Sequence, residues 1–401
     1  MLIKFKFSNF LSYKDETSLL LSCVTSFKEH LSDNVIKTGR AFNLLKSSAI
    51  FGTNGGGKSN FISAMSFMDA FVHNSFSDSL KSETDRFKTD FYFKLNTHTI
   101  KEPTLFEATF ISNDTIYRYG FQIKGYRVVS EWLYKKVDSE TMLFKRVGSQ
   151  FEINKSGFQE GMRHFKDVNE NVLFISHLAQ YNAKESKLVF NWFRCLNVVS
   201  ALNDEHYKKV TSYLLQEDEA FKAWLKLAVR FLEISTVELS DSNEVITYHN
   251  KFDENNVIVE SISLNFDREE SDGTRKLIYL LGAIYDTLVK GKVLVIDELD
   301  SKLHPNLTRK LIHLFHQLNR NGAQFIFSAQ DANLLDKELF RRDQIWFVDK
   351  DKFGVSSLYP MSDFDSSVVR NTSDFRKKYL SNVFGAAESF EISDQMAELL
   401  I

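Results

Sequence analysis

The fold of this 401-residue chain is decided by residues 52–59, which read Gly52-Thr53-Asn54-Gly55-Gly56-Gly57-Lys58-Ser59. This stretch fits the pattern G-x-x-x-x-G-K-[ST], in which a glycine-rich turn directs backbone N–H groups toward phosphate oxygens. The glycines permit the tight turn, Lys58 supplies a compact positive charge, and Ser59 offers a hydroxyl to a Mg²⁺ ion. The stretch therefore predicts a phosphate-binding loop.

The sequence on both sides of the loop fits this interpretation. Ser48–Phe51 is a short apolar segment typical of a buried strand, and residues 60–72 carry apolar side chains at helical spacing. A helix in this place directs its N-terminus at the bound anion, whereas a flexible surface turn would need neither flanking element. The residues that we expect to contact a nucleoside triphosphate are Gly52, Asn54, Gly55, Gly56, Gly57, Lys58, Ser59 and Asn60.

A second chemical feature lies far downstream, where the apolar run Val293–Ile296 ends in Asp297 and Glu298. A buried parallel strand has this pattern. Asp297 at its carboxyl end is suited to hold Mg²⁺ together with Ser59, and Glu298 is suited to polarise the attacking water as a general base. The alternative is a buried strand with a solvated acidic cap, which the phosphate-binding loop in the same chain disfavours.

A third feature is the string Glu270-Ser271-Asp272-Gly273-Thr274, which precedes a helical pattern of apolar residues. Such a string is a weak signal, because most of them are plain turns or helix caps. Its position ahead of the acidic strand gives it weight. With it, the chain resembles the ABC-type ATPases of the SMC/RecF/OLD branch. The resemblance implies that ATP is the nucleotide and that Ser271, Gly273 and Thr274 form a signature loop, which reaches the γ-phosphate bound by a second subunit. Leu299-Asp300-Ser301 then looks like the D-loop, with Asp300 at the nucleotide.

Within that branch the chain resembles the AAA15-like ATPases of prokaryotic defence loci, which include the RloA/AbiL-type abortive-infection ATPases and the ATPase subunit of PARIS. The resemblance covers nearly the whole chain, and residues 341–350 are the most specific part of it. The stretches that carry it are Met1–Glu16, Tyr117–Phe121, Glu131–Tyr134, Phe340–Lys350, Tyr379-Leu380 and Phe384–Ala386.

This resemblance implies a homodimer or higher homo-oligomer that closes around ATP. It also implies a separately encoded effector, a nuclease or toxin, which is held or released when a phage-derived trigger is sensed. Two alternatives stay open at this stage: a DNA repair ATPase of RecF or SMC type that acts on DNA, and a scaffold that binds ATP without hydrolysing it. Whether nucleic acid is bound is left open as well.

One position departs from the family pattern. A histidine that touches the γ-phosphate is expected after the strand Gln324–Ser328, and Gln330 stands there instead. Glutamine donates a hydrogen bond to phosphate but carries neither a proton for transfer nor a positive charge. We therefore expect Gln330 to act at the catalytic site and turnover to be slow, or else the glutamine to be a neutral replacement.

The amino-acid composition limits which classes of protein remain possible. The chain has 43% hydrophobic residues, 37 phenylalanines and three prolines, which favours well-buried sheets, and its net charge of −3 does not favour a globally basic nucleic-acid binder. Two cysteines at unrelated places and a charged N-terminus predict a cytoplasmic protein without a disulfide framework. We expect no membrane-spanning segment.

The predicted fold class is α/β: an ABC-type P-loop ATPase with a mixed central sheet, an antiparallel β-lobe and a helical insertion. Residues 1–155 are expected to hold the phosphate-binding loop and, from 104 to 155, the antiparallel lobe. Residues 156–232 are expected to form a helical lid or docking surface with Trp192, Trp224 and Leu225 in its core. Residues 233–401 complete the ATPase, with two strands near 235–247 and 256–266 ahead of the signature helix.

Several histidines invite a metal or nuclease role, namely His164 beside Arg163, and His304, His313 and His316. The last two fall on a predicted helix after the acidic strand, where we expect a solvated face. Asp331 and Asp336 lack a third partner at a recognisable spacing for a metal site.

Overall fold

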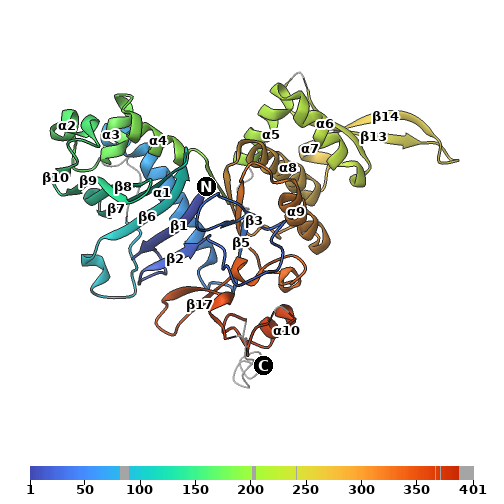
Figure 1. Cartoon of the computed structure of the whole chain (residues 1–401). Helices are drawn as coiled ribbons and strands as arrows, with labels where there is room; N and C mark the ends of the chain where they lie inside the picture. The colour runs from blue at the N-terminus through green and yellow to red at the C-terminus, as the bar shows by residue number, and fades with distance from the viewer. Residues whose placement is uncertain (82–89, 201–204, 241, 366, 371, 388–401) are drawn as a thin grey trace, which may run out of the picture.

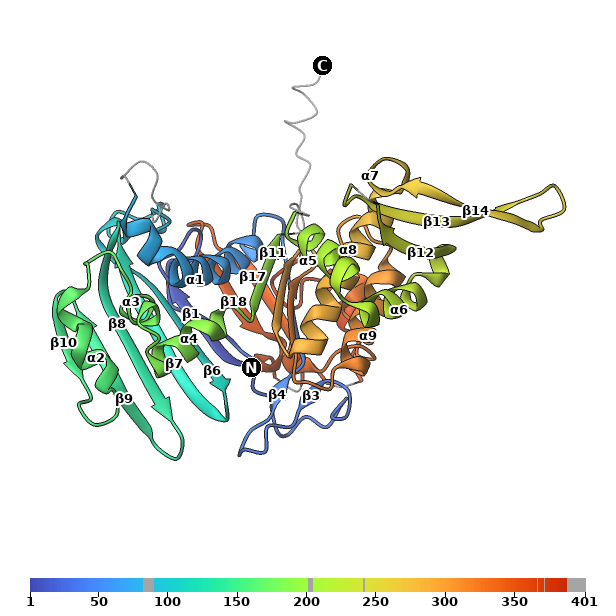
Figure 2. The same cartoon turned by 90° about the horizontal axis from the view of Figure 1, so that it is seen from above.

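The computed structural model describes residues 1–81, 90–200, 205–240, 242–365, 367–370 and 372–387 (Figure 1). Two large sheets share one long helix between them, and a third, smaller sheet projects from the far side (Figure 2). Among the described residues, no helix combines the length and the apolar character needed to cross a membrane.

The central sheet has six strands in the order β11-β15-β16-β5-β17-β18. The first five run parallel, and β18 pairs antiparallel with β17, so the predicted mixed α/β sheet is confirmed. β5 is buried along its whole length, as expected for a strand covered on both faces. The bounds are β5 (Ser47–Gly52), β11 (Leu196–Ser200), β15 (Val293–Asp297), β16 (Gln324–Ser328), β17 (Ile345–Lys350) and β18 (Ser356–Pro360).

The second sheet is antiparallel and has seven strands in the order β10-β9-β8-β7-β6-β1-β2. It contains the lobe predicted for residues 104–155 and adds the first two strands of the chain. The bounds are β1 (Leu2–Ser8), β2 (Thr17–Leu20), β6 (Thr104–Ser112), β7 (Thr115–Lys124), β8 (Arg127–Lys136), β9 (Glu140–Val147) and β10 (Gln150–Ile153).

Helix α1 (Lys58–Ser79) lies between the two sheets, and phenylalanine fills the contact. Phe67 stacks on Phe106 of β6 with 5.0 Å between ring centroids, and Phe61 meets Phe7 of β1 edge-on at 5.7 Å. Aromatic pairs at such distances add to the free energy gained by burying their area. This packing accounts for part of the unusual phenylalanine content and fixes the helix that follows the phosphate-binding loop.

The helices predicted for residues 156–232 divide between two places. α2 (Gln159–His164), α3 (Phe174–Gln180) and α4 (Lys184–Phe193) lie beside the antiparallel sheet and α1, whereas α5 (Glu205–Glu217) and α6 (Glu219–Ala228) pack on α8 (Asp272–Lys290). Strand β11, which the sequence analysis missed, runs between them. Trp192 and Leu225 are core residues as expected, and Trp224 is partly buried. The three-part division of the chain stays a prediction.

The third sheet contains β12 (Ile234–Leu239), β13 (Val245–Phe252) and β14 (Ile258–Asn265). The prediction of one strand over 235–247 is wrong, because the chain turns at Ser240, whose N–H donates to the carbonyl of Glu244 at 2.8 Å. Asn243 has a φ of 60°, which a continuous strand does not permit. β13 and β14 project as a two-stranded arm (Figure 2).

The helix after the acidic strand, α9 (Pro305–Leu318), corrects a prediction about its histidines. His316 is 2% exposed, and its Nε2 lies 2.7 Å from Ser47 Oγ at the start of β5. The expected solvated face holds for His313 but not for His316, which shares the sheet-facing side of the helix with Ile312 and Phe315. Burial lowers the pKa of His316 to about 3, so the imidazole is neutral at pH 7.

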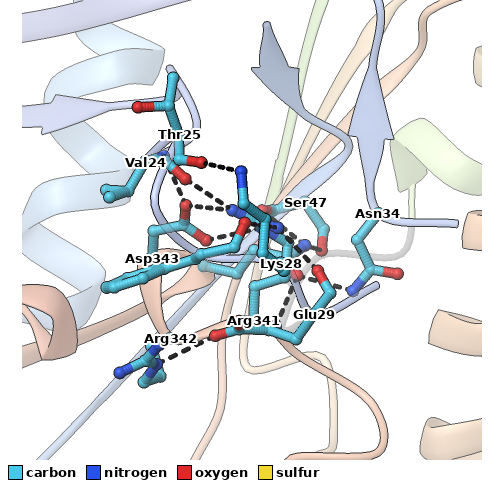
Figure 3. A network of polar contacts seen from close by, with 11 residues as sticks. Val24, Thr25, Lys28, Glu29, Asn34, Ser47, Arg341, Arg342 and Asp343 are labelled. Carbon is cyan, nitrogen blue, oxygen red and sulfur yellow. Dashed lines mark hydrogen bonds and ion pairs between the residues drawn. The ribbon is translucent and has the colours of Figure 1, made fainter. Parts of the chain in front are cut away.

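A buried ionic network joins the N-terminal and C-terminal parts of the chain (Figure 3). Arg341 is fully buried, and its guanidinium donates to both carboxylate oxygens of Asp343 and to the backbone carbonyls of Val24 and Glu29. Gln344, next along the chain, donates to Ser47 on β5. Residues Arg341 and Gln344 therefore hold the segment that precedes the phosphate-binding loop.

The remaining elements are short. They are the hairpin β3 (Val35–Ile36) and β4 (Leu44–Leu45), the helices α7 (Phe266–Glu269) and α10 (Phe375–Leu380), and the 3-10 turns η2 (Thr99–Lys101), η3 (Phe165–Asp167), η4 (Arg230–Leu232), η5 (Ala332–Leu334), η6 (Arg342–Gln344) and η7 (Met361–Asp363).

Candidate nucleotide-binding site

The glycine-rich loop lies between the carboxyl end of β5 and the N-terminus of α1, as predicted. Lys58 is 6% exposed, and its Nζ donates to the carbonyls of Gly52 (2.8 Å) and Thr53 (3.1 Å), so the ammonium lies inside the loop. A Cβ on Gly52 would lie 2.1 Å from the carbonyl oxygen of Val348, and Gly57 has a φ of 126°. Positions 52 and 57 of the loop therefore require glycine. The ammonium of Lys58 and the backbone N–H groups of the loop fit a polyphosphate.

Three side chains that the sequence analysis did not single out brace this loop. Ser356 Oγ donates to the carbonyl of Gly56 at 2.5 Å, and Tyr13 Oη donates to the carbonyl of Gly57 at 3.1 Å. Ser12 Oγ accepts from the Asn60 amide at 2.7 Å and lies 2.8 Å from Ser356 Oγ, to which it donates because the Ser356 proton is used at Gly56. Ser12 and Tyr13 belong to the N-terminal stretch of the family resemblance, which was a usable signal, whereas Ser356 on β18 has none.

Asp297 and Glu298 stand at the carboxyl end of β15, on the same edge of the parallel sheet as the loop after β5. Ser328 on the intervening strand β16 holds both residues, since its hydroxyl donates to Asp297 Oδ1 at 2.5 Å and accepts from the backbone N–H of Glu298 at 2.7 Å. Glu298 has a φ of 51°, in the left-handed region that non-glycine residues seldom adopt. A strained residue at this edge is typical of a functional site.

The structure brings Gln330 and Asp300 to the same place. Gln330 Nε2 donates to Glu298 Oε1 at 3.0 Å. Asp300 Oδ2 accepts from the backbone N–H groups of Gln330 (2.8 Å) and Asp331 (2.6 Å), so Asp300 of the predicted D-loop caps the turn that carries Gln330. The carboxylate of Glu298 is therefore oriented by an amide that cannot accept or release a proton at ordinary pH.

The signature loop is built differently. Ser271 caps α8 by accepting from the N–H of Thr274 at 3.1 Å, and Ser271 and Asp272 are exposed. Asp272 pairs with Arg275 and with Lys302, which follows the predicted D-loop, and hydrogen bonds from these two cations lower the pKa of Asp272. A Cβ on Gly273 would lie 3.0 Å from the carbonyl of Lys302, so the signature loop is in close contact with the residue after the D-loop.

The phosphate-binding loop and the signature loop belong to opposite faces of the central sheet. Side chains of α1 pack with Val293, Val295 and Ile326, whereas side chains of α8 pack with the alternate residues of the same strands, such as Leu294 and Ile296. One chain thus carries two separate parts of the predicted site.

The histidines and the carboxylates Asp331 and Asp336 form no metal centre in the part of the chain that the structure describes, where no three His, Cys, Asp or Glu residues gather. Asp336 pairs with Arg309 at 2.6 Å, and Asp331 caps the turn η5. His164 stacks on Tyr181, with 4.0 Å between ring centroids.

Residues 47–336 match the family described as "AAA domain, putative AbiEii toxin, Type IV TA system". Among solved structures, the SMC head domain from Thermotoga maritima has 14% identity and a TM-score of 0.43, over 90% of this chain and 98% of that one. The SmcHead bound to the C-winged helix domain of ScpA has 14% identity and a TM-score of 0.38, over 90% and 97%.

No curated protein matches the sequence. The family match runs through the phosphate-binding loop, the signature loop and the acidic strand, and it covers most of the chain. This chain therefore belongs to that AAA-domain family, and it is a P-loop ATPase by fold.

Proposed function

We propose that this protein binds ATP with Mg²⁺ and hydrolyses it slowly, as a switch that controls a second protein. The observation that carries the proposal is the meeting of the phosphate-binding loop, Asp297 and Glu298 at one edge of the parallel sheet. Ligand sites of open α/β sheets lie at the carboxyl ends of their strands.

Each residue has one task in this proposal. The N–H groups of residues 52–60 and the ammonium of Lys58 bind the phosphates, and the Ser59 hydroxyl and Asp297 hold Mg²⁺, which offsets negative charge on the phosphates. Glu298 orients the attacking water, and its contact with Gln330 at 3.0 Å supports that placement. Slow turnover follows from the glutamine, which adds no positive charge to the transition state.

The exposed signature loop supports a dimer. The loop lies on the face of the sheet opposite to α1, with Ser271 exposed and Gly273 and Thr274 half-buried, so it can contact the nucleotide of a second copy. Two copies would then enclose two ATP molecules, each bound by one phosphate-binding loop and capped by the other copy's signature loop. In this arrangement ATP holds the homodimer, or a higher homo-oligomer, together and hydrolysis loosens it.

The protein that is controlled is, in this proposal, a separately encoded nuclease or toxin in the bacterial cytoplasm, restrained until a phage-derived trigger is sensed. The family description names a putative toxin of a Type IV TA system, which supports a role in such a system, and the separate effector follows from the resemblance to defence-locus ATPases. The glutamine at position 330 favours a second candidate, a scaffold that binds ATP without hydrolysing it, because an amide supplies neither a proton nor a positive charge.

The test compares ATP turnover and assembly size of the wild type with those of Glu298→Gln. We expect the variant to lose turnover by roughly 100-fold or more and to form a more persistent ATP-dependent dimer. If neither protein hydrolyses ATP and both form the same ATP-dependent particle, the scaffold is correct. Salt-dependent DNA binding without a partner protein would instead favour a RecF-like role.

A further inference from the structure

Lys276 is a buried lysine on α8, two residues after Thr274 of the signature loop. It is 3% exposed, and its Nζ lies 2.7 Å from both the carbonyl oxygen and the Oγ of Ser301 and 3.1 Å from the carbonyl oxygen of Glu298. A buried ammonium is costly unless its protons are hydrogen-bonded, and three oxygens match its three donors. Lys276 therefore joins the signature helix to the turn that carries Glu298.

The backbone of Glu298 is held from two sides. Its N–H donates to Ser328 on β16 at 2.7 Å, and its carbonyl accepts from Lys276 on α8 at 3.1 Å. Because the φ of 51° at Glu298 is unfavourable for a residue with a Cβ, the turn relies on such contacts. Together they direct the carboxylate toward Gln330.

The same turn touches the signature loop directly. Asp272 pairs with Lys302 at 3.1 Å, but more than half of each side chain is exposed, and exposed ion pairs contribute little. The bonds of Lys276 are shielded from water, so they form the stronger link between the loop and the D-loop.

We propose that Lys276 is a positioning residue that sets the carboxylate of Glu298 according to the place of the signature loop in the same chain. Contact of that loop with ATP on a second copy then orients Glu298 for hydrolysis of the ATP on the first. The two nucleotide sites of the dimer are coupled through this side chain. The inference rests on the proposed function and names its regulation.

The experiment uses Lys276→Met, Lys276→Arg and the control Lys46→Met in the full-length protein. Lys46 is 7% exposed and donates to the backbone carbonyl of His316 at 2.8 Å, so its replacement also removes a buried lysine that binds a carbonyl group. We expect kcat to fall by about 10- to 100-fold in Lys276→Met, since small misplacements of a catalytic group have such effects, while the Kd for ATP changes less than about twofold. Lys276→Arg should restore part of kcat, because its fork can reach two oxygens.

Two further measurements separate this inference from the proposed function. In a Glu298→Gln background, Lys276→Met should lower the residual kcat no further, because residues that act as a unit are not additive. In the nucleotide-free protein, hydrogen exchange should accelerate at residues 298–303 in Lys276→Met but not in Lys46→Met.

Unchanged exchange at 298–303, or an additive loss in the double variant, would overturn the role of Lys276 whatever the turnover. A wild type without any turnover would instead overturn the proposed function, and accelerated exchange would then still show that Lys276 holds the turn.

Discussion

The two loops that are expected to enclose ATP differ in how they are held. The phosphate-binding loop is braced by Tyr13 and Ser356, its lysine is buried, and β5 lies in the middle of the central sheet. The signature loop is exposed at Ser271, and its residues Asp272 and Gly273 contact Lys302 of the same chain.

The phosphate-binding loop and the signature loop differ in this way because they have different structural requirements. A loop that surrounds phosphates must hold its N–H groups in place before the ligand arrives, because ordering them at binding would weaken affinity. A loop that contacts a second copy needs an accessible surface instead. Substitutions in the first should therefore change ATP affinity, and substitutions in the second should change assembly.

The largest effect is expected for Gly57→Ala. The φ of 126° is strained for alanine, and the added Cβ would lie 2.5 Å from Ser356 Oγ. We expect the Kd for ATP to rise by roughly 100-fold or more, because strain and displacement together cost on the order of 3 kcal/mol. Isothermal titration measures this. The control is Gly125→Ala, which has a φ of 55° and no atom within 4 Å of the added Cβ. Equal loss in both variants would contradict the importance of the packing.

The next largest effect is expected for a substitution in the signature loop, and it concerns the ATP-dependent dimer. Ser271→Arg places a long cation on the exposed loop and should weaken the ATP-dependent dimer by roughly tenfold or more, since a poorly fitting side chain at an interface commonly costs over 1 kcal/mol. ATP binding to the monomer should not change. Light scattering with and without ATP reports assembly, and Ser149→Arg, on the exposed turn between β9 and β10, is the control. An unaltered dimer would count against a signature loop at the interface.

A smaller effect, on the rate of ATP turnover, is expected for a substitution of Gln330. Gln330→His introduces a group that can carry a proton or a positive charge beside Glu298, so turnover should rise by up to about tenfold. Its turnover should also depend on pH near 6.5, the ordinary pKa of histidine. Steady-state rates from pH 5.5 to 8.5 test this, with Gln317→His on α9 as the control. Identical rates in the wild type and Gln330→His would show that the glutamine is a neutral replacement.

The smallest effect on ATP turnover at pH 7.5 is expected for a substitution of His316. This residue instead affects how the free energy of unfolding depends on pH. Its pKa is about 3 in the folded protein and about 6.5 when unfolded, so the unfolded state binds more protons between these values. This contribution to the stability is complete well above pH 6.5 and is lost as pH falls toward 3, by about 1.6 kcal/mol between pH 6.5 and 5.

Urea unfolding at several pH values measures this loss. The dependence should diminish in His316→Gln and persist in His313→Gln, where the side chain is exposed. A wild type with the same unfolding free energy at pH 6.5 and pH 5 would show that His316 is not held neutral.

The sequence predicted the parts of the fold that local patterns specify. The strand and helix around the glycine loop follow from apolar spacing, and β6 to β10 follow from alternation. Strand β11 was missed because its five residues lie among helices, and a parallel edge strand has no local turn signal. His316 was misjudged because its burial depends on which face of α9 meets the sheet, which is a property of tertiary packing.

The candidate site shows the same limit. Sequence motifs identified Lys58, Asp297 and Glu298. No sequence pattern near Ser356 or Lys276 predicted that the first contacts the phosphate-binding loop and the second contacts the turn at Glu298. Such contacts depend on how the elements meet in space, so spacing along the chain cannot reveal them.

The strand order of the central sheet has a consequence for synthesis of the chain. β5 lies between β16 and β17, and Ser47 at its start meets Gln344 across 297 positions of sequence. At ordinary rates of about 5 to 20 residues per second, a ribosome needs roughly 15 to 60 s to make that interval. The apolar β5 therefore leaves the ribosome before its neighbours β16 and β17 exist, and it lacks its parallel partners during that interval. The predicted phosphate-binding loop is thus made early, whereas the strands on both sides of β5 are completed only near the end of synthesis.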